Sequence, residues 1–210
     1  LIAILNRGWY WVDFDGVQKQ KKIETMEDFN NLLQYEYSRV PLGRGSYSRI
    51  YTSGSSEPDY VLKVNNIPND QDGWFKFAKP VIEGRMWGRN TLIPEILYIG
   101  SIQDYAIGIM EYVEFDRSFN ISRYQDLEDQ YDLEINLKGL CNDIAFDILS
   151  NNINENNLKA FCDMFNVSRD QAIHYFRFMI DNTLWMNLDI HTGNFGTRKD
   201  GSFVIFDPVA

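Results

Sequence analysis

The chain has 210 residues, of which 44% are hydrophobic and 15% aromatic, so it can form a sizeable core and lacks the composition of a disordered protein. Its formal net charge of −10 argues against a protein that coats nucleic acid or an anionic membrane, since either would favour a basic surface. The two cysteines, Cys141 and Cys162, have neither the spacing of a zinc site nor a disulfide framework, which favours a reducing cytoplasm.

The ends of the chain carry no targeting signal that we can identify. No apolar run reaches the roughly 18 residues of a membrane span, and the opening Leu1-Ile2-Ala3-Ile4-Leu5 is too short for the core of a signal peptide. The chain lacks an initiator methionine and stops three residues after Asp207. We therefore expect it to be a fragment of a longer protein.

The first part of the chain is predicted to be an extension without catalytic residues. Residues 1–17 alternate apolar and polar side chains, which indicates a short strand or hairpin. Thr25 to Asp28 resembles a capping box, so we predict a helix over residues 25–37. Residues 1–37 then form an N-terminal extension.

A glycine-containing hairpin is predicted next. Gly43 and Gly45 lie between β-forming residues, in a pattern that suits a hairpin whose backbone N–H groups cover phosphates. A plain glycine turn is the alternative interpretation.

Residues 60–64 are predicted to form a strand that carries Lys63 inside an otherwise apolar run. A buried lysine is costly unless its ammonium meets an anion, so Lys63 is a candidate for binding nucleotide phosphates. A lysine on an exposed strand edge is the alternative. A helix is predicted over residues 80–87 with Pro80 in its first turn, and we expect its Glu83 to pair with Lys63; an exposed glutamate is the alternative.

Two further strands are predicted over residues 94–99 and 105–113, around a turn at 101–104. The second strand ends in Met110-Glu111-Tyr112-Val113, where backbone groups could bond the edge of an adenine. Residues 116–157 are acidic and rich in asparagine, with apolar side chains at helical intervals. This pattern predicts helices with solvated acidic faces.

Two short segments of the helical part have specific interpretations. The cluster Asp126-Leu127-Glu128-Asp129 lacks the glycine and alternating oxygen ligands of a calcium loop, so we interpret it as a solvated or partner-binding face. Ser168 is predicted to cap a helix that leads directly to Asp189.

The most informative stretch runs from Leu188 to Gly196, in which Asp189 precedes Asn194 by five positions. A predicted hairpin after Gly196 would return Asp207 to the side of Asn194. Phosphoryl transfer needs one carboxylate to orient the attacking hydroxyl, and an amide and a second carboxylate to hold magnesium. These are the roles expected of Asp189, Asn194 and Asp207. An ordinary Asx-rich loop before a hairpin is the alternative.

Taken in order, these motifs resemble those of the protein-kinase-like superfamily over roughly residues 38–210. The resemblance implies a two-lobed α+β fold, with a small antiparallel-sheet N-lobe at 38–113 and a mainly helical C-lobe at 114–210. The C-lobe would contain an acidic helical insertion at about 116–165 and be truncated after its metal-binding aspartate.

The resemblance also implies an ATP site, in which the glycine loop covers the phosphates, Lys63 contacts the α- and β-phosphates, two side chains sandwich adenine, and a gatekeeper precedes the hinge. The ATP-binding residues implied in this way are Gly43, Gly45, Ser46, Ile50, Val61, Lys63, Glu83, Met110, Glu111 and Val113. Asp189 and Lys63 would be the catalytic residues, with Asn194 and Asp207 as ligands of Mg²⁺.

Within the superfamily, the chain most resembles the early serine/threonine protein kinases of T-seven-like podophages. The motifs that carry this resemblance are Gly45-Ser46-Tyr47-Ser48, Val61-Leu62-Lys63-Val64, His191-Thr192-Gly193-Asn194 and Asp207-Pro208-Val209-Ala210. It implies a phage-encoded kinase that uses ATP and Mg²⁺ in the cytoplasm of a host bacterium. Its partners would be host proteins, including transcription and RNA-processing machinery, and neither nucleic acid nor a membrane.

Several departures from the superfamily pattern leave other functions open. Ser48 replaces the third loop glycine, Asn187-Leu188 replaces the usual His-Arg, and Pro208-Val209 follows Asp207 in place of Phe-Gly. The sequence Asp189-Ile190-His191 resembles the corresponding motif of small-molecule kinases. His191 would then lie near the phosphates, or it would brace the loop. Since no peptide-docking segment follows Asp207, a binding protein that inhibits a host target through its acidic surface is a further alternative.

Overall fold

The structure is a computed structural model of the chain. It describes residues 9–12, 18–21, 25–35, 41–44, 48–52, 58–66, 72–85, 90–102, 105–133 and 136–209. The fold is α+β, as predicted, and it forms two compact units. We refer to Leu1–Ile82 with Glu95–Tyr112 as the N-terminal unit, and to Glu83–Pro94 with Val113–Ala210 as the C-terminal unit.

The N-terminal unit begins with the two elements predicted for the extension. Strands β1 (Trp9–Val12) and β2 (Gln18–Lys21) pair antiparallel, and helix α1 spans Met26–Tyr35. The capping box is present, because Asp28 N donates to Thr25 Oγ1 at 3.1 Å and Thr25 N donates to Asp28 Oδ2 at 3.0 Å. Residues 1–8 and 13–17 of the predicted strand or hairpin lie outside the described residues.

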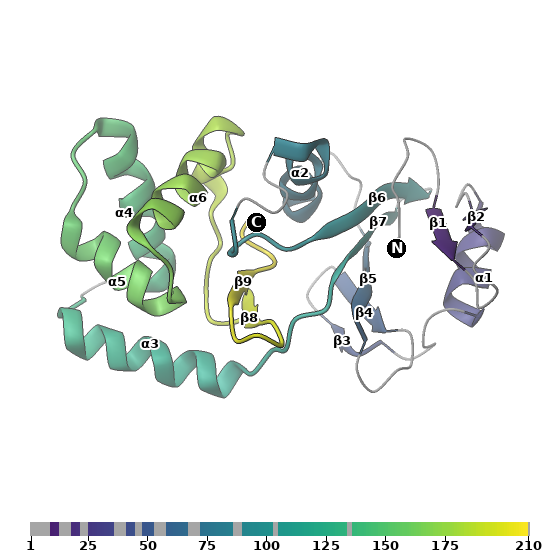
Figure 1. Ribbon diagram of the computed structural model, residues 1–210, viewed down its shortest axis with the longest axis horizontal. Helices are drawn as coiled ribbons and strands as arrows, with labels where there is room; N and C mark the ends of the chain where they lie inside the picture. The colour runs from purple at the N-terminus through teal and green to yellow at the C-terminus, as the bar shows by residue number, and fades with distance from the viewer. Residues whose placement is uncertain are drawn as a thin grey trace. The chain divides into compact units, whose positions relative to one another are not determined.

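A five-stranded antiparallel sheet forms the body of this unit, in the order β3-β4-β5-β7-β6 (Figure 1). Its strands are β3 (Gly43–Arg44), β4 (Ser48–Thr52), β5 (Tyr60–Asn65), β6 (Ile96–Ile102) and β7 (Tyr105–Glu111). The predicted glycine hairpin is present as the pairing of β3 with β4. Strand β6 runs on to Ile102, so the prediction that it ends at residue 99 is wrong; pairing of Ser101 with Ala106 and of Ile102 with Tyr105 continues the ladder.

The two faces of the sheet differ in what covers them. One face buries an apolar cluster in which Phe29 of α1 meets alternate residues of β5 and β7. The members of this cluster are Phe29, Tyr51, Leu62, Val64, Leu97, Ile107 and Ile109. Lys63 and Asn65, which alternate with Leu62 and Val64, are also buried, so β5 is covered on both faces.

Helix α2 spans Gly73–Pro80 and continues as a π-helical turn, Val81–Arg85, so the prediction that this helix begins at Pro80 is wrong. The helix begins earlier because Asp72 is its N-cap and accepts a hydrogen bond from Phe75 N at 2.9 Å. Trp74 lies so close to Gly108 that a Cβ there would be 2.0 Å from the indole ring. Gly108 is therefore required where α2 packs on the sheet.

Four helices dominate the C-terminal unit: α3 (Arg117–Tyr131), α4 (Leu137–Ser150), α5 (Glu155–Phe165) and α6 (Arg169–Asp181) (Figure 1). Four of the asparagines of this segment lie at helix ends. Asn136 and Asn154 are N-caps, while Asn151 and Asn166 end helices with φ near +50°, a conformation that asparagine tolerates well. Ser168 forms the predicted cap, in a capping box with Gln171.

The acidic cluster Asp126-Leu127-Glu128-Asp129 is part of α3, with Asp126 and Asp129 exposed, which agrees with the prediction of a solvated face. Both cysteines are free, and burial raises the pKa of Cys141 and of Cys162. Among the described helices, none combines the length and the apolar character needed to cross a bilayer.

The C-terminal unit ends in the predicted hairpin, formed by β8 (Phe195–Thr197) and β9 (Phe203–Ile205). A series of aromatic rings joins this hairpin to the helices. Phe161 lies 4.7 Å from Phe165 and 4.8 Å from Phe176 between ring centroids, and Phe165 lies 5.1 Å from Phe195. The hairpin is thus fixed by the same apolar core that holds α5 and α6 together.

Candidate functional site

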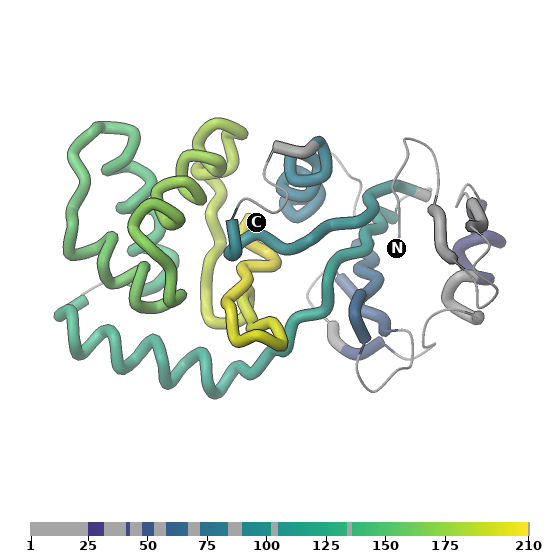
Figure 2. Tube along the Cα trace, in the orientation of Figure 1, coloured from purple at the N-terminus to yellow at the C-terminus, as the bar shows by residue number. Residues whose placement is uncertain are grey.

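The loop between the 3-10 turn Trp185–Asn187 and β8 carries two of the three predicted phosphoryl-transfer residues. Asp189 N donates to Pro208 O at 2.8 Å, and Leu188 forms an isolated β-bridge with Val209. The start of this loop therefore runs antiparallel to the segment that follows the hairpin, as the chain trace shows (Figure 2). Asp189 and Asp207 lie on these two paired segments.

Asn194 joins Asp189 to Asp207. Its side-chain Nδ2 donates to Asp189 O at 2.7 Å, and its backbone O accepts from Phe206 N at 3.0 Å and from Asp207 N at 3.4 Å. The amide oxygen Oδ1 takes no part in these bonds. The structure thus brings Asp189, Asn194 and Asp207 together within the C-terminal unit, and the hairpin returns Asp207 to Asn194 as predicted.

His191 braces this loop. Its Nδ1 accepts from Gly193 N at 3.0 Å, and a Cβ on Gly193 would lie 2.8 Å from His191 Cε1. The other ring nitrogen, Nε2, is 3.8 Å from Asp189 Oδ2. These contacts agree with the bracing interpretation of His191, and its position near phosphates stays a prediction.

Lys138 is a site residue that the sequence did not reveal. Its Nζ lies 2.9 Å from Asp189 Oδ1, with side-chain exposures of 48% for Lys138 and 31% for Asp189. The two residues are 51 positions apart, on α4 and on the loop. One signal was available, since Lys138 is the only lysine or arginine between Arg123 and Lys159 in a strongly acidic segment.

Asn120 of α3 is a second residue that sequence reasoning missed. It is 2% exposed, and its Nδ2 donates to Thr192 O and to Phe195 O, both at 3.0 Å. One buried amide thereby satisfies a carbonyl of the loop after Asp189 and a carbonyl at the start of β8. Asn120 fixes the shape of the loop without being part of it.

We expect Asn120→Asp to destabilise the C-terminal unit by about 2 kcal/mol and to lower any activity that depends on the conformation of this loop. The carboxylate cannot donate a hydrogen bond, and it would face two carbonyl oxygens. Urea unfolding followed by circular dichroism measures the loss. Gln125→Glu adds the same charge at an exposed position of α3 and serves as the control. Equal stability of the two variants would show that the Asn120 hydrogen bonds do not hold the loop.

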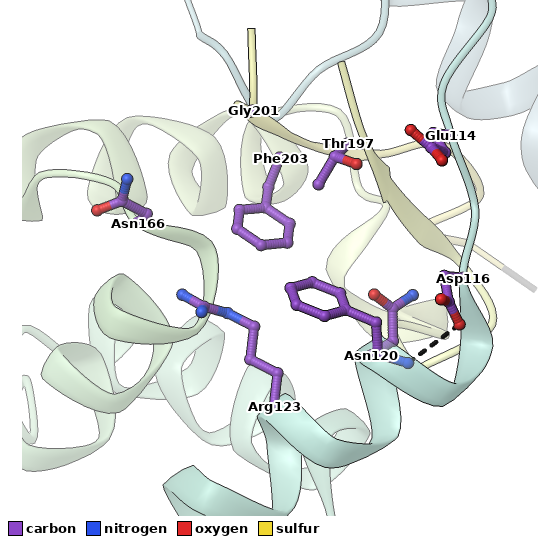
Figure 3. A pocket seen from close by; sticks show the side chains of 9 residues that line it. Glu114, Asp116, Asn120, Arg123, Asn166, Thr197, Gly201 and Phe203 are labelled. Atoms are coloured by element: carbon purple, nitrogen blue, oxygen red, sulfur yellow. Dashed lines mark hydrogen bonds between the residues drawn. The ribbon is translucent and has the colours of Figure 1, made fainter. Parts of the chain in front are cut away.

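A cavity of about 620 Å³ lies on the other side of Asn120, between α3 and the hairpin (Figure 3). Arg123 lines it, with its guanidinium 4.9 Å from the centroid of Phe203 and with hydrogen bonds to Met164 O and Asp163 O at 2.6 Å. Burial lowers the pKa of Arg123, although the Asp163 and Asp126 carboxylates act in the opposite direction. The cavity is lined by Glu114, Asp116, Phe119, Asn120, Arg123, Asn166, Thr197, Gly201 and Phe203.

Lys63 lies in the N-terminal unit, at the middle of β5, and is 4% exposed. The alternative of a lysine on an exposed strand edge is therefore wrong. Its Nζ lies over the Trp74 ring, 4.9 Å from the centroid, where the cation–π attraction partly offsets the cost of burial. Asp189, Asn194 and Asp207 belong to the C-terminal unit, so convergence of Lys63 with them stays a prediction.

Several other residues predicted to bind ATP lie on strands of the five-stranded sheet. Ile50 of β4 pairs with Gly43 and with Lys63, and Val61 of β5 pairs with Met110 of β7. Val61 and Met110 are buried, at 5% and 3% exposure.

The remaining candidates lie at element ends. Glu111 ends β7; its N donates to Glu95 O and its Oε1 accepts from Glu95 N. Val113 begins the segment that leads to α3. Glu83 is exposed in the π-helical turn, and its pairing with Lys63 stays a prediction. Gly45 and Ser46 lie outside the described residues.

Neither known proteins nor a cluster of metal-binding side chains in the described part of the chain identifies the site. No protein-family model matches the chain, and no curated protein matches it. Within the described residues, no group of three or more His, Cys, Asp and Glu side chains could hold a metal ion. The donors at Asn194 and Asp207 would instead suit Mg²⁺, which commonly takes one or two protein ligands and completes its shell with phosphates and water.

Proposed function

We propose that the chain is a Mg²⁺- and ATP-dependent phosphotransferase with a two-lobed, kinase-like arrangement, and that it transfers the γ-phosphoryl group to serine or threonine of host bacterial proteins. One observation carries this proposal. Asn194 is hydrogen-bonded to both of the other residues, since its Nδ2 donates to Asp189 O and its backbone O accepts from Asp207 N, so a candidate base and two candidate metal ligands are held next to one another.

In this proposal the protein promotes transfer mainly by positioning the attacking hydroxyl and by neutralising charge on the triphosphate. Asp189 orients the attacking hydroxyl and accepts its proton, while the carbonyl of the same residue is held by Asn194 Nδ2. Asn194 Oδ1 and the Asp207 carboxylate would hold Mg²⁺, which supplies neutralisation of charge on the triphosphate. His191 within the loop and Asn120 on α3 keep the loop in shape through their hydrogen bonds.

Lys63 is proposed to contact the α- and β-phosphates, with adenine held between Ile50 and Val61 beside Met110. The support for this role is the position of Lys63 on β5, where it is 4% exposed and pairs with Ile50 of β4.

Lys63→Met is expected to weaken ATP binding about tenfold and to lower transfer by about 10²-fold, because the phosphates lose a buried cation while the stem volume is kept. ATP titration by calorimetry and a transfer assay measure the two effects. Lys79→Met, at an exposed position of α2, is the control. If Lys63→Met binds ATP like the wild type, the lysine has no role in nucleotide binding.

The fate of labelled phosphate tests the proposed reaction. The protein is incubated with γ-labelled ATP, Mg²⁺ and a heat-treated bacterial lysate, so that host kinases do not contribute. We expect label on serine and threonine of lysate proteins, and none with Asp189→Asn. Label in small metabolites would instead favour a small-molecule kinase, the alternative suggested by the Asp189-Ile190-His191 motif.

A binding protein that inhibits a host target is the alternative from a different class. The observations that favour it are the net charge of −10 and the exposed carboxylates of Asp126 and Asp129 on α3. Expression of Asp189→Asn in bacteria separates the two functions, because a binding protein would keep its full effect on the host and a kinase would lose it.

A further inference from the structure

The ion pair between Lys138 and Asp189 is not explained by helix stability. Lys138 is the second residue of α4, after the N-cap Asn136. Positive charge in the first turn of a helix is unfavourable, because the helix dipole already places partial positive charge there. An exposed ion pair of this kind also stabilises a fold little. The position of Lys138 therefore favours a role for its charge at Asp189.

The backbone of Lys138 is well fixed, whereas its ammonium is accessible. Leu137, Leu140 and Cys141 on the same helix are 3%, 1% and 0% exposed, so the start of α4 is anchored in the core. The Lys138 side chain itself is 48% exposed and meets an Asp189 side chain that is 31% exposed. A ligand that approaches Asp189 would also reach the ammonium of Lys138.

The proposed reaction creates a need for such a cation. A phosphoryl group that carries negative charge must approach the carboxylate of Asp189, and the two repel each other. Lys138 Nζ, 2.9 Å from Asp189 Oδ1, is in a position to neutralise part of both charges. Asp189 Oδ2, on the His191 side, would remain available for the hydroxyl of the substrate.

We propose that Lys138 is a further catalytic residue, which contacts the transferring γ-phosphoryl group from α4 while Asp189 holds the hydroxyl. This inference rests on the proposed function. In the step, a bond forms between the hydroxyl oxygen and the γ-phosphorus as the bond to the β,γ-bridging oxygen breaks. The electron pair of that bond leaves with ADP, the proton of the hydroxyl goes to Asp189, and Lys138 keeps its proton and supplies charge.

The test compares Lys138→Ala, Lys138→Arg and the wild type in the assay with γ-labelled ATP, Mg²⁺ and heat-treated lysate. Removing a cation that acts in the transition state should lower the maximal rate by about 10²-fold, with the KM for ATP changed by less than about threefold. Lys138→Arg should recover at least about a tenth of the wild-type rate, because it restores the charge with a different shape. Thermal melting of all three should agree closely.

Lys159→Ala is the control, since Lys159 is an exposed lysine of α5 whose ammonium lies over the Tyr131 ring. It should transfer phosphate like the wild type. A wild-type rate for Lys138→Ala, or a faster one, would overturn this inference and leave the proposed function intact. Failure of the wild type itself to transfer label would overturn the proposed function, and the role of Lys138 with it.

Discussion

Replacing Asp189 by asparagine is expected to lower phosphoryl transfer by about 10³-fold or more while ATP affinity changes by less than about threefold. The amide keeps the shape of the side chain but cannot accept the proton of the hydroxyl. The backbone bonds of residue 189 to Pro208 and to Asn194 do not depend on its carboxylate, so the loop should keep its conformation.

The measurement is a single-turnover transfer assay together with ATP titration by calorimetry. Asp181→Asn, at an exposed position at the end of α6, is the matched control and should behave like the wild type. Near-wild-type transfer by Asp189→Asn would remove Asp189 from the mechanism. Loss of ATP binding together with transfer would show a structural role instead.

Phe161→Ala is expected to destabilise the C-terminal unit by about 3–5 kcal/mol. Phe161 is completely buried and packs between Phe165 and Phe176, so its removal leaves a cavity at the point where α5 meets α6. Because Phe165 in turn packs against Phe195 at the start of β8, the loss should also loosen the hairpin that carries Asp207.

Urea unfolding followed by circular dichroism measures this loss, and Phe161→Leu should lose less because it refills part of the cavity. Phe146→Ala removes the same ring from a position that is 63% exposed and should change stability by less than about 0.5 kcal/mol. Equal losses for Phe161→Ala and Phe146→Ala would contradict the assignment of the core.

Local features of this fold could be predicted from the sequence because each depends on residues close together in the chain. The capping boxes at Thr25 and Ser168 and the hairpin before Asp207 are of this kind. The start of α2 could have been predicted as well. Trp74, Phe77, Ala78 and Val81 recur at helical intervals and are all buried, and Asp72 is a residue type that commonly caps a helix.

Long-range features of the candidate site could not be predicted in the same way. Asn120 donates to Thr192 O across 72 residues, and Lys138 meets Asp189 across 51. Nothing in the periodicity of α3 or α4 specifies which loop these side chains reach, because that depends on how the helices pack. From the sequence alone, Asn120 is a polar residue near the start of a helix, and Lys138 is a cation in an acidic segment.

We propose that Asn194 and Asp207 hold a metal ion against a nucleotide, and this role can be tested by titrating ATP with and without Mg²⁺. For the wild type, we predict that Mg²⁺ tightens ATP binding at least about tenfold, and that Asp207→Ala loses this gain. If Mg²⁺ has no effect on ATP affinity, or if Asp207→Ala shows the full effect, Asn194 and Asp207 do not hold a metal ion against the nucleotide.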